Sequence, residues 1–229
     1  MPVPTELQEK INKGLEAVET HSRHHFHWSH RKGLYPAFGT YNDPNVLKAR
    51  GWLAVLTAQY VFPILEATPT EIDDLLHSML KASVGYLNGI VSAEEIASIE
   101  DEGYHTLGNW ADWDDPGYSP RADIAARAVY KAAGEVRGKR QDPFEYAKNH
   151  TKYTLDGPIS GDTFSDSDWV SLAGVGDTAG CAALAYAATD ENVSSYSHQK
   201  LEEFWKWWLL EAIPQAWALA EASPNQSIE

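Results

Sequence analysis

Apolar residues recur every three or four positions along most of the chain, which is the period of an α-helix. Between residues 5 and 20, one face carries Leu7, Ile11, Leu15 and Val18. Between residues 70 and 87, the same spacing connects Ile72, Leu75, Leu76, Met79, Leu80 and Leu87. No segment alternates apolar and polar residues over a length sufficient for a sheet. The pattern therefore predicts an all-α fold.

Two other helices are predicted to form much of the core. Residues 46–67, VLKARGWLAVLTAQYVFPILEA, are apolar on most sides, which indicates a central helix. Pro63 should kink or end this helix, because proline lacks the backbone donor. The last helix is expected from about Ser195 to Ala222 and should bend at Pro214. Its large apolar residues, expected to close the core, are Phe204, Trp205, Trp208, Leu209 and Ile213.

Capping residues predict where the helices begin. The predicted N-caps are Asp43, Thr70, Ser92, Ser119 and Asp177. Ser92 and Glu95 also have the spacing of a capping box, and Gly89 should close the helix before them. Asp142-Pro143 predicts one more short helix. Residues 103–120, GYHTLGNWADWDDPGYSP, are expected to be irregular.

We predict one all-α domain over residues 1–229, an irregular bundle of seven to nine helices. An N-terminal helix and a histidine-rich segment would occupy residues 1–40, and a helical core residues 44–150. Five glycine or proline residues predict a long loop over residues 151–176. The C-terminal helices would fill residues 177–222.

Composition narrows the class of protein. The chain has 229 residues, of which 43% are hydrophobic, enough for a sizeable core. No apolar run approaches the roughly 18 residues of a membrane span, and the polar N-terminus predicts no signal peptide. The single Cys181 excludes an internal disulfide. The net charge of -15 disfavours nucleic-acid binding. We expect a soluble cytoplasmic protein that binds neither membrane nor nucleic acid.

The negative charge is concentrated in two blocks, of which residues 51–120 hold twelve acidic residues against one basic residue. Within this block, residues 110–115 place two tryptophans among three aspartates, a composition suited to a protein-binding surface. Trp110 or Trp113 would anchor the partner. The candidate partner-binding residues are Glu100, Asp101, Glu102, Trp110, Asp112, Trp113, Asp114 and Asp115.

The histidine-rich segment HSRHHFHWSH, residues 21–30, offers a different hypothesis. If it is helical, His21, His24 and His25 share one face, and imidazoles at such spacing can bind a transition metal. No carboxylate lies between Glu19 and Asp43, however, and the flanking basic residues would repel a cation. The alternative to a metal site is a helix end, where basic side chains complement the terminal carbonyls. A metal-dependent enzyme using His24 and His27 thus stays a second hypothesis, and no cofactor is expected otherwise.

Other motifs in the sequence give weaker evidence of function. Residues 112–123 partly match a calcium loop, but Pro116 occupies a ligand position. Cys181 lies in a run of small apolar residues typical of a buried cysteine, and no nucleophile elbow is present. A third hypothesis is self-assembly through the helix that carries Trp205 and Trp208.

The stretch from Asn45 to Ile96 resembles the all-α immunity proteins encoded beside toxins in bacterial polymorphic toxin systems. The similar features are a helix ending in VFPILEA, a second helix ending in YLNGIVSAEEI, and a closing helix with EEFWKWWLLEAI at residues 202–213. The resemblance implies a non-enzymatic protein that binds and neutralises one cognate toxin. A net charge of -15 suits a basic toxin, because complementary fields accelerate association.

Overall fold

The computed structural model describes residues 2–65, 68–112, 118–138, 177–193 and 195–222. Within these ranges the chain is helical, and the only β-type pairing is an isolated bridge between Ala188 and Tyr196. The predicted all-α fold class is therefore confirmed. No helix in these ranges is both long and apolar enough to cross a bilayer.

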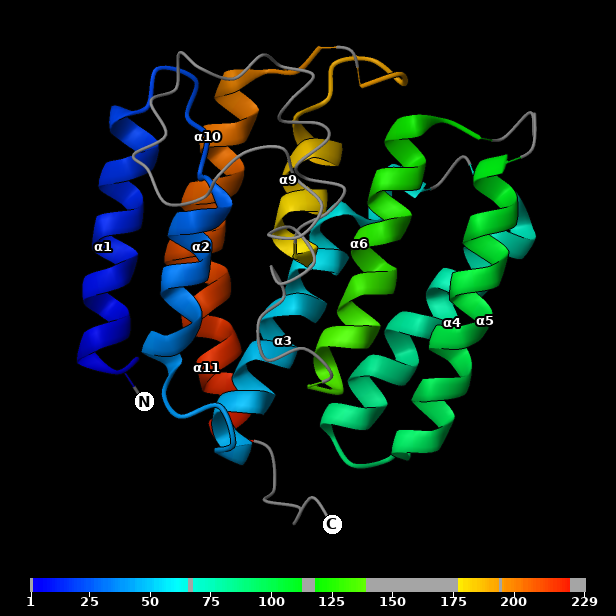
Figure 1. Cartoon of the computed structure of the whole chain (residues 1–229), viewed down its shortest axis with the longest axis horizontal. Coiled ribbons are helices and arrows are strands. Elements are labelled where there is room, and N and C mark those ends of the chain that lie inside the picture. Colours follow the sequence, from blue (N-terminus) through cyan, green and yellow to red (C-terminus); the bar gives the residue numbers. More distant parts are fainter. Residues whose placement is uncertain (1, 66–67, 113–117, 139–176, 194, 223–229) are drawn as a thin grey trace.

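The helices lie side by side around a central one (Figure 1). Helix α3 (Pro44–Val61) runs through the middle and contacts α6 (Pro120–Val136), α9 (Thr178–Ala187) and α11 (Ile213–Ala222). At one edge, α1 (Thr5–Thr20) packs against α2 (Trp28–Leu34) and α10 (His198–Trp207). At the other edge, α4 (Thr70–Leu87) and α5 (Ala93–Asp112) pack against each other and against α6.

Helix α3 occupies the centre because small and branched apolar residues cover most of its circumference. Ala49, Val55, Ala58 and Val61 are fully buried. Gly51 allows the neighbouring helices to approach, since a Cβ atom there would lie 2.7 Å from Leu87 Cδ2 and 3.3 Å from the Val136 Cα. The prediction of a buried central helix is confirmed.

Most predicted helix ends are also confirmed. Asp43, Ser119 and Asp177 each accept a hydrogen bond from a backbone N–H in the first turn of α3, α6 and α9. In the capping box, the Ser92 N–H donates to Glu95 Oε2 at 2.8 Å, and the Glu95 N–H donates to Ser92 Oγ at 3.1 Å. Thr70 as an N-cap was wrong: it is the first residue of α4, and Pro69 holds the cap position without a side-chain hydrogen bond.

A break in the regular α-helix precedes each of the two prolines. Helix α3 ends at Val61, two residues before Pro63, and a 3₁₀ turn (Phe62–Leu65) follows. In the C-terminal helix, a π-helical turn (Trp208–Ala212) separates α10 from α11, which contains Pro214. Buried residues recur there at intervals of four, a spacing that drifts around a helix of 3.6 residues per turn. The wider π turn takes up this drift.

The prediction of an irregular segment at residues 103–120 was wrong over its first half, because α5 continues to Asp112. The helix has a regular buried stripe of Ile96, Glu100, Gly103, Leu107 and Trp110, spaced by three or four residues. Residues 113–117 and 139–176, which include the predicted short helix at Asp142-Pro143 and the predicted loop 151–176, lie outside the described residues.

Candidate partner-binding surface

The outer face of α5 is turned to solvent. Since its buried stripe packs on α4 and α6, the residues between the stripe positions point away from the bundle. Along two neighbouring lines on this face lie Glu94, Ser98, Asp101, His105 and Gly108, and then Glu95, Glu102 and Asn109. All of these residues are exposed.

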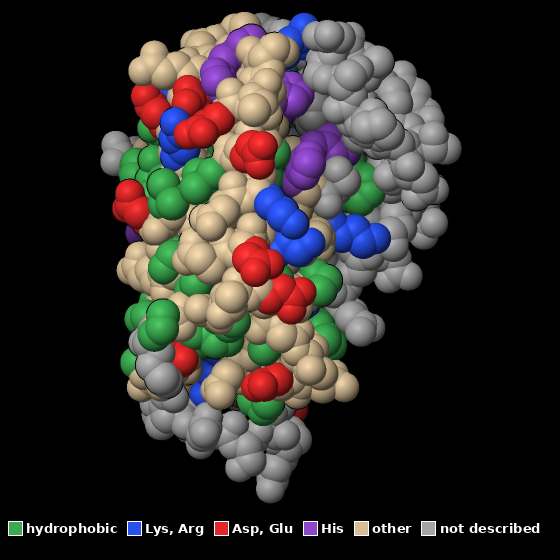
Figure 2. Space-filling view, turned by 90° about the vertical axis from the view of Figure 1, so that its left-hand side faces the viewer, with side chains coloured by type: hydrophobic (Ala, Val, Ile, Leu, Met, Phe, Trp, Pro, Cys, Tyr) green, Lys and Arg blue, Asp and Glu red, His purple; other side chains and the backbone are tan. Residues whose placement is uncertain are grey.

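This face is strongly negative. Residues 68–112, which form α4 and α5, contain nine acidic residues and a single basic residue, Lys81. The exposed carboxylates, which we call the acidic surface, belong to Glu71, Asp74, Glu94, Glu95, Asp101 and Glu102. Clustered charge of one sign raises the local concentration of oppositely charged partners. The α1 edge differs, because basic and acidic side chains are interspersed there (Figure 2).

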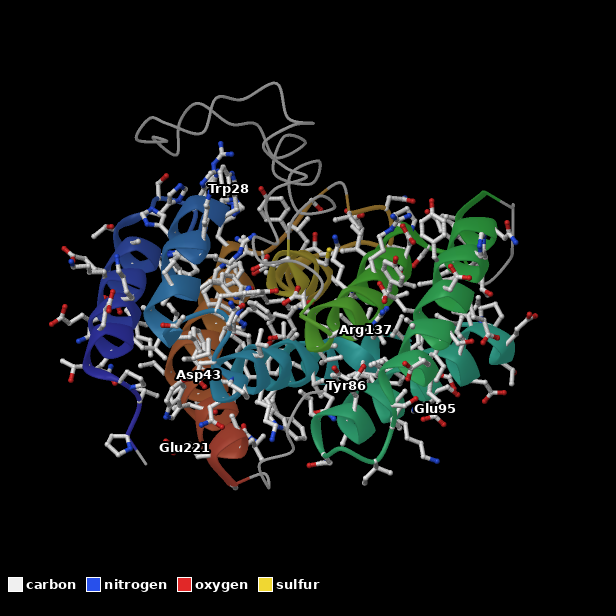
Figure 3. The ribbon with its side chains drawn as sticks, turned by 60° about the horizontal axis from the view of Figure 1, so that its bottom comes forward. Trp28, Asp43, Tyr86, Glu95, Arg137 and Glu221 are labelled. Atoms are coloured by element: carbon white, nitrogen blue, oxygen red, sulfur yellow. The ribbon has the colours of Figure 1, made fainter. Side chains whose placement is uncertain are left out.

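Glu100 does not belong to this surface, contrary to the sequence prediction. The residue is buried, and its side chain turns inward, where Oε2 lies 2.5 Å from Arg137 Nη1 at the end of α6. Gly134 leaves space for the Glu100 carboxylate, since a Cβ atom at this position would lie 3.2 Å from Glu100 Oε1. Figure 3 shows Arg137 nearer to the middle of the molecule than Glu95. Glu100 therefore joins α5 to α6.

The aromatic residues of the predicted site also divide by burial. Trp110 is only 5% exposed and packs edge-on against Tyr118 with ring centroids 5.3 Å apart, so it is not a surface anchor. Asp112 is the last residue of α5, and Trp113, Asp114 and Asp115 lie outside the described residues. The exposed aromatic residue on α5 is Tyr104, at 63%. The sequence analysis did not single out Tyr104. Its position directly after Gly103, a residue of the buried stripe, could have indicated that its side chain is exposed.

An exposed isoleucine marks one end of the acidic surface. The turn between α4 and α5 passes through Gly89, whose φ of +69° favours glycine. The backbone N–H groups of Ile90 and Val91 both donate to the Gly85 carbonyl. This geometry packs Val91 against α4 and leaves Ile90 80% exposed.

The histidine-rich segment has a structural role in the described chain. Residues 21–27 are not helical, so the face that His21, His24 and His25 would share on a helix does not form. His25 Nε2 lies 3.1 Å from the hydroxyl of Tyr196, and this contact ties the segment to the turn before α10. Burial lowers the pKa of His25 to about 2 and that of His27 to about 3.

His24 sits in the left-handed region with a φ of +54°. Its Nδ1 lies 2.9 Å from the Val18 carbonyl oxygen, and its Nε2 lies 3.6 Å from Glu202 Oε2. Among the residues that the structure describes, no three histidine, cysteine, aspartate or glutamate side chains form a group that could hold a metal. No described geometry therefore supports the metal hypothesis based on His24 and His27.

The described structure defines an all-α protein with an acidic face at one edge of the bundle. A family model, Immunity protein Imm5, matches residues 11–215. The chain belongs to this family. The resemblance seen in residues 45–96 and 202–213 is thus confirmed, and the match extends from within α1 to within α11. A search of curated proteins found no match.

Proposed function

We propose that this protein neutralises one cognate toxin by binding it through the acidic surface of α4 and α5, with Tyr104 and Ile90 as apolar contacts. Membership of an immunity protein family supports a toxin as the partner. The observation that carries the choice of surface is the set of six exposed carboxylates on two helices whose only basic residue is Lys81. The toxin surface facing them is basic.

The two kinds of side chain have different roles in this proposal. The carboxylates attract a basic partner over about 10 Å at moderate salt, so they chiefly set the rate of association. Tyr104 and Ile90 lose solvent on contact, so they chiefly set the rate of dissociation. Glu95 is the exception among the acids, because its carboxylate also closes the capping box of α5.

Removing three exposed charges from α5 tests the electrostatic part. We expect Glu94→Gln/Asp101→Asn/Glu102→Gln to slow association with the purified cognate toxin about tenfold at low salt. The salt dependence should flatten as well, because fewer charges are screened. Stopped-flow measurements at stepped ionic strength give both quantities. The matched control is Glu6→Gln/Glu9→Gln/Glu16→Gln on α1, which removes the same net charge. Equal slowing by the control, or an unchanged rate in the α5 variant, would contradict the proposal.

Shortening Tyr104 tests the apolar part. We expect Tyr104→Ala to raise the Kd for the same toxin at least roughly tenfold, mainly through faster dissociation, as for an aromatic hot spot. Stability should change little because the side chain is 63% exposed. Tyr104→Phe keeps the ring and should keep most of the affinity. Surface plasmon resonance measures both variants, and wild-type dissociation of Tyr104→Ala would remove Tyr104 from the interface.

A further inference from the structure

A second surface, on helices other than α4 and α5, combines aromatic rings with carboxylates. Tyr60 of α3 stacks on Trp207 of α10 with ring centroids 3.8 Å apart and planes inclined by 21°. Tyr186 of α9 lies beside them, 5.2 Å from Tyr60 between centroids. All three side chains are half-buried, and Leu210 beyond them is 52% exposed. We call Tyr60, Tyr186, Trp207 and Leu210 the aromatic patch.

The patch rests on a rigid floor. Phe204, fully buried below it, lies 5.7 Å from Tyr60 and from Trp207 and 6.1 Å from Tyr186 between ring centroids. Three helices far apart in the sequence thus hold the rings in fixed positions. A preformed surface of aromatic rings loses little conformational entropy when it binds a partner.

The π turn brings an aliphatic residue to the same face. Trp208, Leu209 and Ala212 stay buried through the turn, and Leu210 projects into solvent. Glu203, Trp207, Leu210 and Glu211 follow one another at intervals that place them on one side of the helix. Single π turns within α-helices are frequent at functional sites.

The patch is negatively charged at its border. Glu203 and Glu211 are exposed, and both carboxylates lie close enough to Tyr60 to disfavour its ionisation. Partial burial and a hydrogen bond to the Tyr186 side chain are the main causes that raise the pKa of the Tyr60 phenol well above its usual range, and the two glutamates add to them. The protein's own Lys200 illustrates what these rings attract: its Nζ lies 5.8 Å from the centroid of Tyr186.

We propose that the aromatic patch, with Glu203 and Glu211, binds an arginine side chain of the toxin as a second contact. This inference rests on the proposed function for the identity of the partner. A guanidinium group is planar, stacks on Trp and Tyr rings, and donates to carboxylates in the same plane, which an ammonium group does less well. A second copy of this chain is a poorer occupant, because a net charge of -15 on each copy opposes their contact.

The recognition chemistry can be tested without the toxin. The probe is the blocked peptide acetyl-Gly-Arg-Gly-amide, and the readout is the indole N–H signal of Trp207, assigned by its loss in Trp207→Phe. We expect a saturable shift of this signal with the arginine peptide. At least threefold weaker binding is expected for the lysine peptide of the same form, and for Glu203→Gln/Glu211→Gln with the arginine peptide. Glu9→Gln/Glu16→Gln on α1 is the charge-matched control and should bind as the wild type does.

The outcomes separate this inference from the proposed function. No shift, equal binding of the lysine peptide, or unchanged binding by Glu203→Gln/Glu211→Gln would overturn the arginine site and leave the acidic surface of α4 and α5 untouched. Conversely, the variant Glu94→Gln/Asp101→Asn/Glu102→Gln should bind the peptide normally even if it no longer binds toxin. A dimer in sedimentation equilibrium that Leu210→Ser dissociates would assign the patch to a second copy and overturn the proposal.

Discussion

Replacing Asp177 with alanine is expected to lower the free energy of unfolding by about 3–5 kcal/mol, the cost of breaking a buried ion pair. Asp177 is 1% exposed and pairs with buried Arg31, whose Nε and Nη2 each lie 3.0 Å from Asp177 Oδ1. The carboxylate also accepts from the Tyr35 hydroxyl at 3.2 Å and from the Gly180 N–H at 3.0 Å. One side chain therefore joins α2, the turn after it and α9.

Two further variants separate the contributions to this loss. Asp177→Asn keeps the shape and the capping oxygen but removes the charge, so we expect an intermediate destabilisation. Asp43→Ala removes an exposed N-cap that forms no ion pair with any described residue, and should cost only about 1 kcal/mol. Urea unfolding followed by circular dichroism measures all three. If Asp177→Ala costs no more than Asp43→Ala, the ion pair contributes nothing beyond capping.

Helix positions could be predicted from the sequence because the signals are local. A cap such as Ser119 and the proline after it act within one turn, so neighbouring residues suffice to place the start of α6. The sequence prediction missed the part of α5 beyond residue 102, because residues 103–114 are rich in glycine, tryptophan and aspartate, a composition typical of loops. The prediction gave this composition more weight than the helical spacing of Gly103 and Leu107 in the buried stripe. In this segment the helical spacing of the buried residues predicts the structure better than the composition does.

The sequence predicted the negative charge of the candidate site. It did not predict which individual residues are exposed there. Counting charges located the acidic block of α4 and α5, since like charges near in sequence stay near in a helical hairpin. Whether a residue faces solvent depends on which neighbour covers it. Glu100 and Asp101 are adjacent in the sequence. Glu100 is buried and pairs with Arg137 at the end of α6, whereas Asp101 is exposed to solvent. That distinction requires the packing of α5 on α6.

The aromatic patch could not have been predicted, because its members come from three separate helices. Sequence reasoning considered the C-terminal helix as a self-assembly surface through Trp205 and Trp208, but both are buried. The tryptophan between them, Trp207, is partly exposed, and Tyr60 stacks on it from α3. Only the tertiary fold brings residues 60, 186 and 207 together.

We expect this protein to lose much of its stability as the pH falls below 6.5. This loss begins well before the pH is low enough to protonate most carboxylates. His25 and His27 are buried and have pKa values of about 2 and about 3 in the folded protein, against 6.5 in an unfolded chain. Burial is the main cause in both cases. Nearby basic side chains add to it: His21, His198 and Arg23 act on His25, and Arg31 and His30 act on His27.

Between pH 6.5 and about 3, the unfolded chain therefore binds two protons that the folded protein does not. Stability is complete above pH 6.5 and falls as the pH drops through this window, by up to about 2.7 kcal/mol per pH unit for the two residues. Going from pH 8 to pH 5 should lower the free energy of unfolding by about 4 kcal/mol through these histidines alone. Urea unfolding at a series of pH values gives this slope directly.

The variant His25→Gln/His27→Gln assigns the effect, because glutamine can form hydrogen bonds without titrating. It should be less stable than the wild type at pH 8, where the buried contacts are perturbed, but should lose about 4 kcal/mol less between pH 8 and pH 5. His77→Gln/His105→Gln is the matched control, since both side chains are exposed on α4 and α5. Its slope should follow the wild type. A steep loss that persists in His25→Gln/His27→Gln would place the acid sensitivity elsewhere in the fold.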